Sequence, residues 1–206
     1  MKLLSTLTFL VVLSFLNLAS AKDLNEVRSF IDHLMQECIK LANHIEQEGD
    51  DLHDDHILKI TNILDEYFDV KVMAEFAAGR YWNGMNMEQR ASLANFYKDF
   101  LAINYLPIIF EYRNFNYVIN NVATYGKRGY VVTTDIRSHN KAFAKELKVH
   151  YLVVLPKDRD RLIVNDIILD GVSMVVSHRS DFAYVLESGG VEALLKQGQN
   201  SLIRKR

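Results

Sequence analysis

Hydrophobic residues in the first half of the chain recur at alternating steps of three and four, the spacing that places them on one face of an α-helix. One such stripe runs from residue 27 to residue 45, and another begins after the acidic pair Asp50 and Asp51. The two stripes predict two amphipathic helices, each with one apolar side to bury. Their apolar positions are Val27, Ile31, Leu34, Cys38, Leu41 and Ile45 in the first helix, and Ile57, Ile60, Leu64 and Tyr67 in the second.

Polar residues mark where two further helices begin. Asp69 can accept hydrogen bonds from the free amides of a short helix that ends near Gly79. Asn86, followed three residues later by Gln89, is a capping-box signal for a longer helix. Pro107 is expected to bend or end that helix, because proline has no amide hydrogen to donate. The apolar face of the long helix is wide and aromatic, with Leu93, Phe96, Tyr97, Phe100, Leu101, Tyr105 and Ile108.

From about residue 115 the period changes to that of β-strands, and short joints such as Gly126-Lys127-Arg128-Gly129 favour antiparallel neighbours. Two helical patterns, 173–187 and 190–203, close the chain. This order predicts an α+β fold, in which an antiparallel four-stranded sheet within residues 115–169 packs against N-terminal helices and two C-terminal helices. The strands are expected at 115–125, 129–138, 146–155 and 161–169, with one face of the third formed by Leu147, Val149, Tyr151, Val153 and Leu155.

The first residues have the three parts of a secretory signal peptide. Met1 and Lys2 precede a mostly apolar stretch that ends at Leu18, and Ala19-Ser20-Ala21 follows as the cleavage signal. The stretch is shorter than the ~20 residues that a membrane-spanning helix needs. We therefore expect residues 1–21 to be a cleaved signal peptide and residues 22–206 to form one soluble, exported domain.

Charge and metal-binding residue types narrow the function further. The formal net charge of −2 argues against a nucleic-acid partner, and Cys38, the only cysteine, can form no internal disulfide. His53 and His56 have a spacing that lets two imidazoles face one metal ion. They lack a clear third ligand, and the helix dipole explains the acidic residues between them, so no metal site is predicted.

Three residues near the C-terminus are of the types found in an acyl-transfer triad: Ser173, His178 and Asp170. The sequence around the serine has only one of the glycines that a nucleophile elbow needs. We therefore interpret Ser173 as a helix cap and predict no catalytic residue. Arg179 lies on the same helical side as Val175 and Phe182, so its guanidinium is expected to approach buried surface and to need a carboxylate or ligand partner. Of these two, a structural ion pair with a carboxylate is favoured.

Two dense groups of residues resemble the MlaC or toluene-tolerance family of periplasmic phospholipid-binding proteins. The resemblance covers nearly all of residues 22–203, and the group after residue 165 is the more specific one. There are two departures: Leu162 stands where the family usually has a tryptophan, and His178 where it usually has an aromatic residue. The matching residues are Phe68-Asp69, Met73-Ala74, Gly79-Arg80-Tyr81-Trp82, Glu88-Gln89-Arg90, Phe96, Phe100-Leu101 and Tyr105 in the first group, and Asp166, Asp170-Gly171-Val172-Ser173-Met174-Val175, Arg179-Ser180-Asp181-Phe182 and Gly190-Val191-Glu192-Ala193-Leu194-Leu195 in the second.

The resemblance implies a non-enzymatic carrier in the periplasm, with no cofactor. Such a protein encloses a glycerophospholipid as cargo and exchanges it between an outer-membrane lipoprotein complex and an inner-membrane ABC transporter complex, which maintains outer-membrane lipid asymmetry. It also implies that the helices and the sheet enclose an apolar cavity. The residues expected to line that cavity are Met73, Phe96, Tyr97, Phe100, Leu101, Tyr105, Val149, Tyr151, Val153, Ile167, Met174 and Phe182.

Without the resemblance, the same apolar residues are equally compatible with a filled core. Two other classes of protein then stay open. One is a small-cavity isomerase or hydrolase on a similar helix-plus-sheet fold, which would need an acid–base group with a shifted pKa in the cavity. The other is an adaptor without lipid that only joins other proteins. Lipid that co-purifies with the protein separates the carrier from these alternatives.

Overall fold

The computed structural model describes residues 22–48, 54–111, 115–138 and 146–203, and the predicted signal peptide lies outside these ranges. The predicted order of helices, strands and helices is confirmed. In the described part of the chain, no helix is both long enough and apolar enough to cross a membrane. The helical elements are α1 (Leu24–Gln47), α2 (Asp54–Tyr67), α3 (Val70–Ala78), the 3-10 helix η1 (Gly79–Gly84), α4 (Met87–Glu111) and α5 (Met174–Ile203).

Helices α3 and α4 begin at the polar capping residues that predicted them. The Asp69 carboxylate accepts a hydrogen bond from the backbone N–H of Val72 at 3.2 Å. The Asn86 side chain accepts one from the Gln89 amide, and the Gln89 side chain accepts one from the Asn86 amide, which completes the capping box. Pro107 does not end α4, which continues to Glu111.

The sheet has five strands in the order β1-β2-β3-β4-β5, all antiparallel, so the prediction of four strands was wrong by one. The additional strand pairs with the end of β4 through a tight turn at Asp170 and Gly171, whose φ angles are both positive. Asp-Gly is a strong signal for such a turn, and only two residues remain before α5 begins. The strands are β1 (Phe115–Tyr125), β2 (Gly129–Ser138), β3 (Glu146–Val154), β4 (Ile163–Leu169) and β5 (Val172–Ser173).

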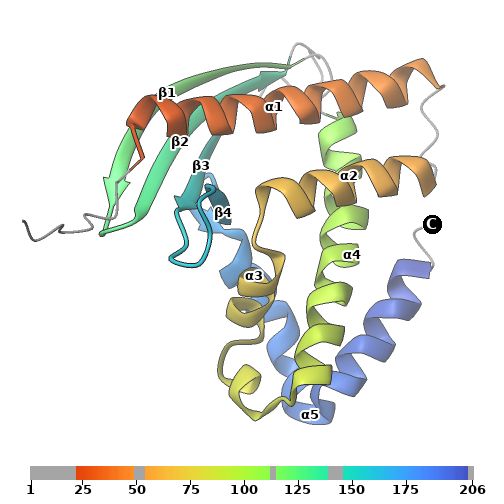
Figure 1. The fold of residues 1–206 in the computed structure, drawn as a ribbon. Helices are drawn as coiled ribbons and strands as arrows, with labels where there is room; N and C mark the ends of the chain where they lie inside the picture. The colour runs from red at the N-terminus through yellow and green to blue at the C-terminus, as the bar shows by residue number, and fades with distance from the viewer. Residues whose placement is uncertain (1–21, 49–53, 112–114, 139–145, 204–206) are drawn as a thin grey trace, which may run out of the picture.

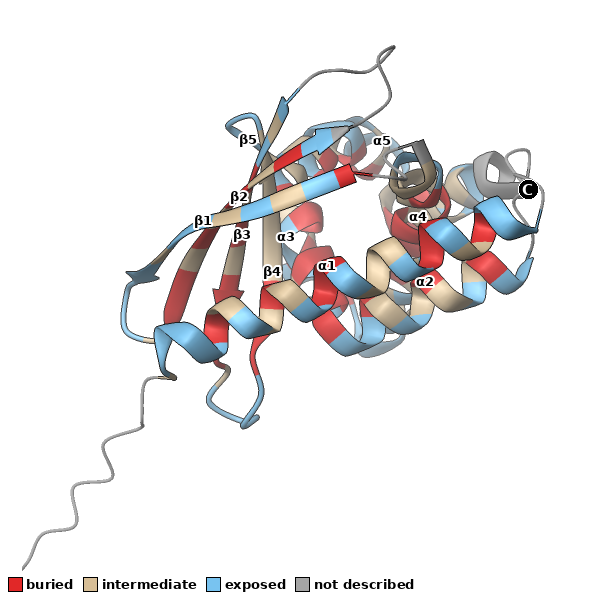
Figure 2. Cartoon of the chain, turned by 90° about the horizontal axis from the view of Figure 1, so that it is seen from above, coloured by how far each residue is buried: buried red, intermediate tan, exposed pale blue. Residues whose placement is uncertain are grey.

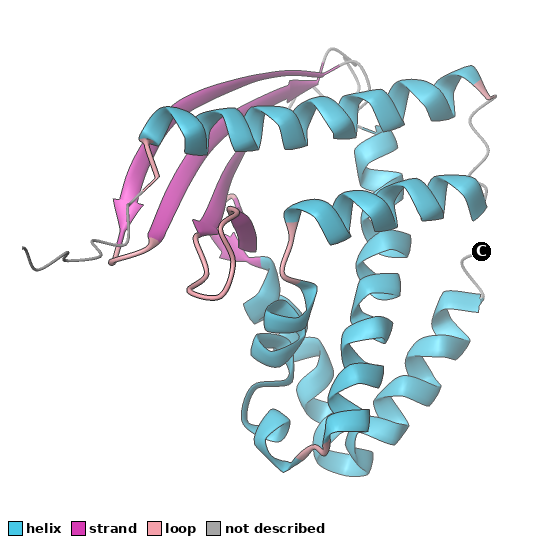
Figure 3. Cartoon of the chain, in the orientation of Figure 1, coloured by secondary structure: helices cyan, strands magenta, loops and turns pink. Residues whose placement is uncertain are grey.

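The strands lie together on one side of the molecule and the helices form the rest of it (Figure 3). α1 runs along the sheet and continues beyond it to lie beside α2, while α4 extends from the region of α3, η1 and α5 up to α1 (Figure 1). α5 contains two helical segments that meet at Gly190, whose φ of 67° is not helical, so the predicted pair of C-terminal helices is confirmed.

Buried residues gather where the sheet and the helices face each other (Figure 2). β3 shows the predicted alternation, because Val149, Tyr151 and Val153 are buried and their neighbours are not. In α1, Cys38 is half-buried and the other residues of the predicted stripe are fully buried. The apolar faces of α1, α2, α4 and the sheet therefore meet in one hydrophobic core.

Candidate functional site

An apolar cavity of about 180 Å³ lies between the sheet and the helices. Side chains from α1 to α5, with Phe68 between α2 and α3, form one part of its wall, and side chains from β1 to β4 form the other. Among the residues that the structure describes, none in the lining is charged. They are Leu34, Met35, Cys38, Ile60, Ile63, Leu64, Phe68, Met73, Leu101, Tyr105, Ile108, Ile109, Phe115, Ile136, Leu147, Val149, Tyr151, Ile167, Leu169 and Met174.

The few polar side-chain groups of the described lining are held in neutral form, and its two tyrosine hydroxyls have partners. The Tyr151 hydroxyl lies 3.1 Å from the sulfur of Met35, and the Tyr105 hydroxyl lies 3.1 Å from the sulfur of Met174. Burial raises the pKa of Tyr105 to about 12 and also raises that of Tyr151. Burial, with a smaller effect of the Glu37 charge, raises the pKa of the Cys38 thiol to about 12. None of these three groups is therefore ionised near neutral pH, and the cavity offers an uncharged surface.

Seven of the twelve residues expected in the lining are found there: Met73, Leu101, Tyr105, Val149, Tyr151, Ile167 and Met174. Four others, Phe96, Tyr97, Phe100 and Phe182, form an aromatic cluster between α4 and α5 instead. The physical reason is that α4 is apolar around much of its circumference. One side meets the cavity, and another packs against α5, so its aromatic residues divide between the two.

His178 occupies the centre of this aromatic cluster. Its Nδ1 lies 2.7 Å from the Tyr97 hydroxyl and its Nε2 lies 3.0 Å from the Tyr105 hydroxyl. Burial lowers the pKa of His178, and the charges of Asp181 and Asp166 oppose that effect only in part. A neutral imidazole has one donor and one acceptor nitrogen, so it can bond both hydroxyls at once. His178 therefore joins α4 to α5 next to the cavity wall.

Val153 was also expected in the lining and is outside it. It is fully buried near the end of β3, where it pairs with Tyr130 of β2 and Val164 of β4, both of which are buried too. Val149 and Tyr151 lie on the same face of the strand and reach the cavity. The strand is longer than the cavity, so its last inward residue belongs to the filled core.

Of the thirteen lining residues that were not predicted, six come from α1 and α2. They include Leu34, Met35 and Cys38 from one helix and Ile60 and Leu64 from the other. Four of these five were predicted as buried positions of amphipathic helices. Periodicity indicates that a residue faces inward, but it does not indicate whether a filled core or a cavity lies there.

The three candidate triad residues have separate structural partners. The Ser173 hydroxyl lies 2.5 Å from Asp166 and accepts a hydrogen bond from the backbone N–H of Val176. Both ring nitrogens of His178 have tyrosine partners, and Asp170 accepts a hydrogen bond from the backbone N–H of Lys148. Ser173 is thus a cap at the start of α5, as its sequence context predicted.

Within the described ranges, Arg179 neither pairs with a carboxylate nor lines the cavity, which corrects the expectation of an ion pair. Its Nε donates a hydrogen bond of 2.6 Å to the backbone carbonyl of Phe76, in the last turn of α3. Gly79 ends that helix with a φ of 56°, and a Cβ on it would lie 3.2 Å from the arginine Nε. The glycine is therefore required for its backbone conformation and for the close approach of the guanidinium.

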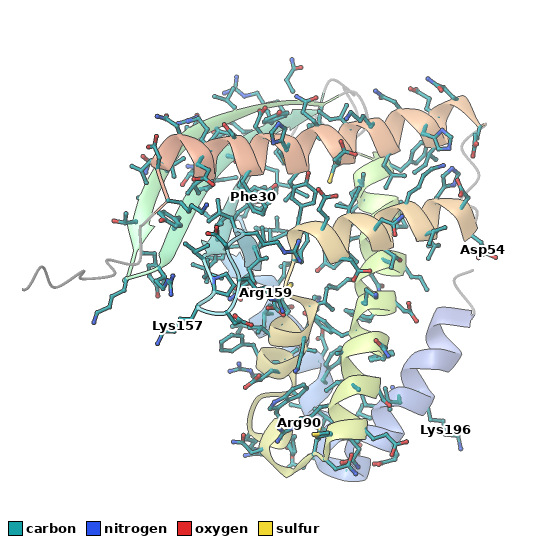
Figure 4. All side chains as sticks on the ribbon, in the orientation of Figure 1. Phe30, Asp54, Arg90, Lys157, Arg159 and Lys196 are labelled. Carbon is teal, nitrogen blue, oxygen red and sulfur yellow. The ribbon has the colours of Figure 1, made fainter. Side chains whose placement is uncertain are left out.

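Other family-like residues also hold α4 to its neighbours. Arg90, labelled in Figure 4, donates a hydrogen bond of 3.2 Å to the backbone carbonyl of Trp82, and its guanidinium lies over the tryptophan ring. The Gln89 side chain donates a hydrogen bond of 2.6 Å to Glu192 of α5. The two sequence groups that carried the resemblance are thus in contact, and many of their polar residues serve the scaffold.

These features define a class: an α+β protein with an antiparallel sheet and a helical body around an uncharged apolar cavity. The family profile described as MlaC protein matches residues 32–199, and the chain belongs to this family. Among solved structures, a phospholipid-binding protein from Ralstonia solanacearum, in complex with a phospholipid, is 19% identical in sequence. Its TM-score is 0.69, and the match covers 90% of this chain and 99% of that one. A search of curated proteins finds no match.

Proposed function

We propose that this protein binds a glycerophospholipid with its acyl chains in the apolar cavity. The observation that carries the proposal is the lining: twenty described residues, from nine helices and strands and one connecting position, none of them charged. An uncharged wall is suited to acyl chains and unsuited to a polar metabolite, which would lose its hydrogen bonds to water without replacement. Membership of the MlaC family and the lipid in the Ralstonia solanacearum relative support the same ligand class.

The energetic need for enclosure is large. Two acyl chains with roughly 30 methylenes would cost about 24 kcal/mol in water, at ~0.8 kcal/mol for each methylene. In a bilayer the chains are already in an apolar medium, so transfer into a protein cavity changes the free energy little. We propose that partners set the direction of transfer, with the protein acting in the periplasm between an outer-membrane lipoprotein complex and an inner-membrane ABC transporter complex.

Lipid binding requires the cavity to widen. Its volume of about 180 Å³ is below the roughly 300–1,000 Å³ of pockets for drug-sized ligands, and a two-chain lipid is larger still. The helix walls are the parts that can separate, because the strands are joined to one another by backbone hydrogen bonds while α1 and α2 meet the sheet and α4 through side chains.

The neutral lining also argues against the enzyme alternative. An acid–base or nucleophilic mechanism needs a group that ionises near the working pH. The thiol and the two phenols of the lining have raised pKa values and stay protonated at neutral pH. We therefore propose binding and transport without catalysis.

The test is lipid extraction from protein that is purified without detergent, followed by mass spectrometry. We expect near-stoichiometric glycerophospholipid with mixed head groups, because an uncharged cavity does not select among them. A lipid-free protein that also takes up no phospholipid from vesicles would overturn the proposal and favour the adaptor. A single non-lipid metabolite in the cavity would favour an enzyme.

A further inference from the structure

A cluster of metal-ligand side chains lies away from the cavity, where α1 ends and α2 begins. His44 and Glu48 are four residues apart and so occupy one face at the end of α1. His56 stands in the first turn of α2, two residues after Asp54, which Figure 4 labels. A ligand atom of each of the three residues lies within 4.8 Å of those of the other two.

The geometry of the cluster is close to that of a bound ion. One carboxylate oxygen of Glu48 lies 3.2 Å from Nε2 of His44, and the other lies 2.9 Å from Nε2 of His56. In a tetrahedral zinc site with bonds of about 2.0–2.2 Å, neighbouring ligand atoms are about 3.3–3.6 Å apart. Each imidazole is therefore already near zinc-site spacing from a Glu48 oxygen, and the three ligand atoms, all within 4.8 Å of one another, need only small side-chain movements to meet one ion.

The surroundings favour a cation. Glu48, Asp54 and Asp55 bring three carboxylates to this end of the two helices, and Lys59 is the cation paired with Asp55. The negative end of the α1 dipole and the positive end of the α2 dipole oppose each other here, so the carboxylates carry the attraction for a cation. His56 is fully buried, so its imidazole is held in a fixed position, while His44 is half-buried and Glu48 is exposed, which leaves a path for an ion from solvent.

We infer that His44, Glu48 and His56 form a binding site for a divalent transition-metal ion of the zinc class, which joins α1 to α2. Two imidazoles and one carboxylate are ligands that suit zinc and disfavour calcium and magnesium, which take oxygen ligands. Water, or Asp55 after a side-chain movement, supplies the fourth ligand. Sequence spacing pairs His56 with His53, which lies outside the described residues. The ligands on α1 come from another helix, so that spacing gives no sign of them.

Lys59 is a competitor at this site. Its ammonium lies 2.5 Å from Nε2 of His44 and also pairs with Asp55. A metal ion needs the same imidazole nitrogen, so the lysine has to leave, and its partly exposed side chain can turn into solvent. Removal of the lysine charge is therefore expected to strengthen metal binding, whereas removal of a ligand is expected to weaken it.

A metal at this position would act on the cavity from a distance. α1 and α2 both contribute side chains to the cavity wall, among them Met35 and Ile60. An ion that links the two helices resists their separation. The three ligand residues lie outside the cavity lining, so metal binding can be tested on lipid-free protein.

The experiment is calorimetric titration of the chelator-treated protein with zinc chloride, together with thermal unfolding in the presence and absence of zinc. We expect one zinc ion for each chain and a rise in Tm. His44→Gln is expected to weaken binding at least tenfold, and Lys59→Gln to tighten it. His33→Gln, which changes an exposed histidine of the same helix outside the cluster, is the matched control and is expected to bind as the parent does.

Two results would overturn the inference. One is the absence of zinc binding and of any zinc-dependent rise in Tm in the parent protein. The other is binding that is equally tight in the parent and in His44→Gln, since the ion would then lie elsewhere. Calcium chloride, tested in the same way, is expected to leave Tm unchanged, and an equal rise with calcium would contradict the proposed ligand set.

Discussion

Tryptophan substitutions at Val149 and Val153 test directly whether the cavity holds lipid. The two valines lie on the same face of β3, four residues apart, and both are buried. Val149 lines the cavity and Val153 does not. Tryptophan at position 149 therefore enters a site with empty space beside the side chain, and tryptophan at position 153 enters one without it.

The size of the effect follows from the cavity volume. At about 24 cal/mol for each Å³ of unfilled space, a cavity of 180 Å³ costs the lipid-free protein about 4 kcal/mol. A tryptophan at position 149 that fills about half of this space would recover about 2 kcal/mol, less the cost of any strained rotamer. At position 153 the same side chain enters a filled core and is expected to cost about 1–3 kcal/mol or more.

The measurement is paired. Urea unfolding of delipidated protein gives the free energy of unfolding, and mass spectrometry of natively purified protein gives the lipid content. We expect Val149→Trp to carry much less lipid while it unfolds at the same or higher urea concentration than the parent. We expect Val153→Trp to be less stable and to keep its lipid. If Val149→Trp is as unstable as Val153→Trp and still carries a full complement of lipid, the placement of the ligand in this cavity is wrong.

Two further substitutions test the polar residues beside the cavity. Ser173→Ala removes the cap of α5 and is expected to cost ~1 kcal/mol of stability with vesicle-to-vesicle lipid transfer unchanged; lost transfer at unchanged stability would instead indicate a chemical role. His178→Phe leaves the buried Tyr97 hydroxyl without its imidazole partner and is expected to cost about 1–3 kcal/mol at neutral pH. Burial lowers the pKa of His178 below 6.5 in the folded protein. As the pH falls below 6.5, the unfolded chain therefore binds a proton at this residue more readily than the folded protein does, and the parent protein loses stability. Urea unfolding between about pH 7 and pH 5 should therefore show a smaller loss for His178→Phe than for the parent, and equal losses would contradict a neutral, buried imidazole.

Local features could be predicted because their physics is local. The caps at Asp69 and at Asn86 with Gln89 act within one helical turn, and the structure contains both. The alternation in β3 follows from a period of two residues and needs no knowledge of the partner strand. The fifth strand was missed because two residues are too few for a visible period, although Asp170-Gly171 carried the signal of its turn.

The sequence by itself determined the order of elements, most of their ends and which sides of them are apolar, since these depend on residues within a few positions of one another. Only the tertiary structure decided which apolar sides enclose empty space. The cavity wall joins Met35 to Tyr151, and the metal-ligand cluster joins the end of α1 to the start of α2. A cavity is space that the side chains of packed elements do not fill, so it depends on how separate elements pack together. The periodic pattern along one element does not predict that packing.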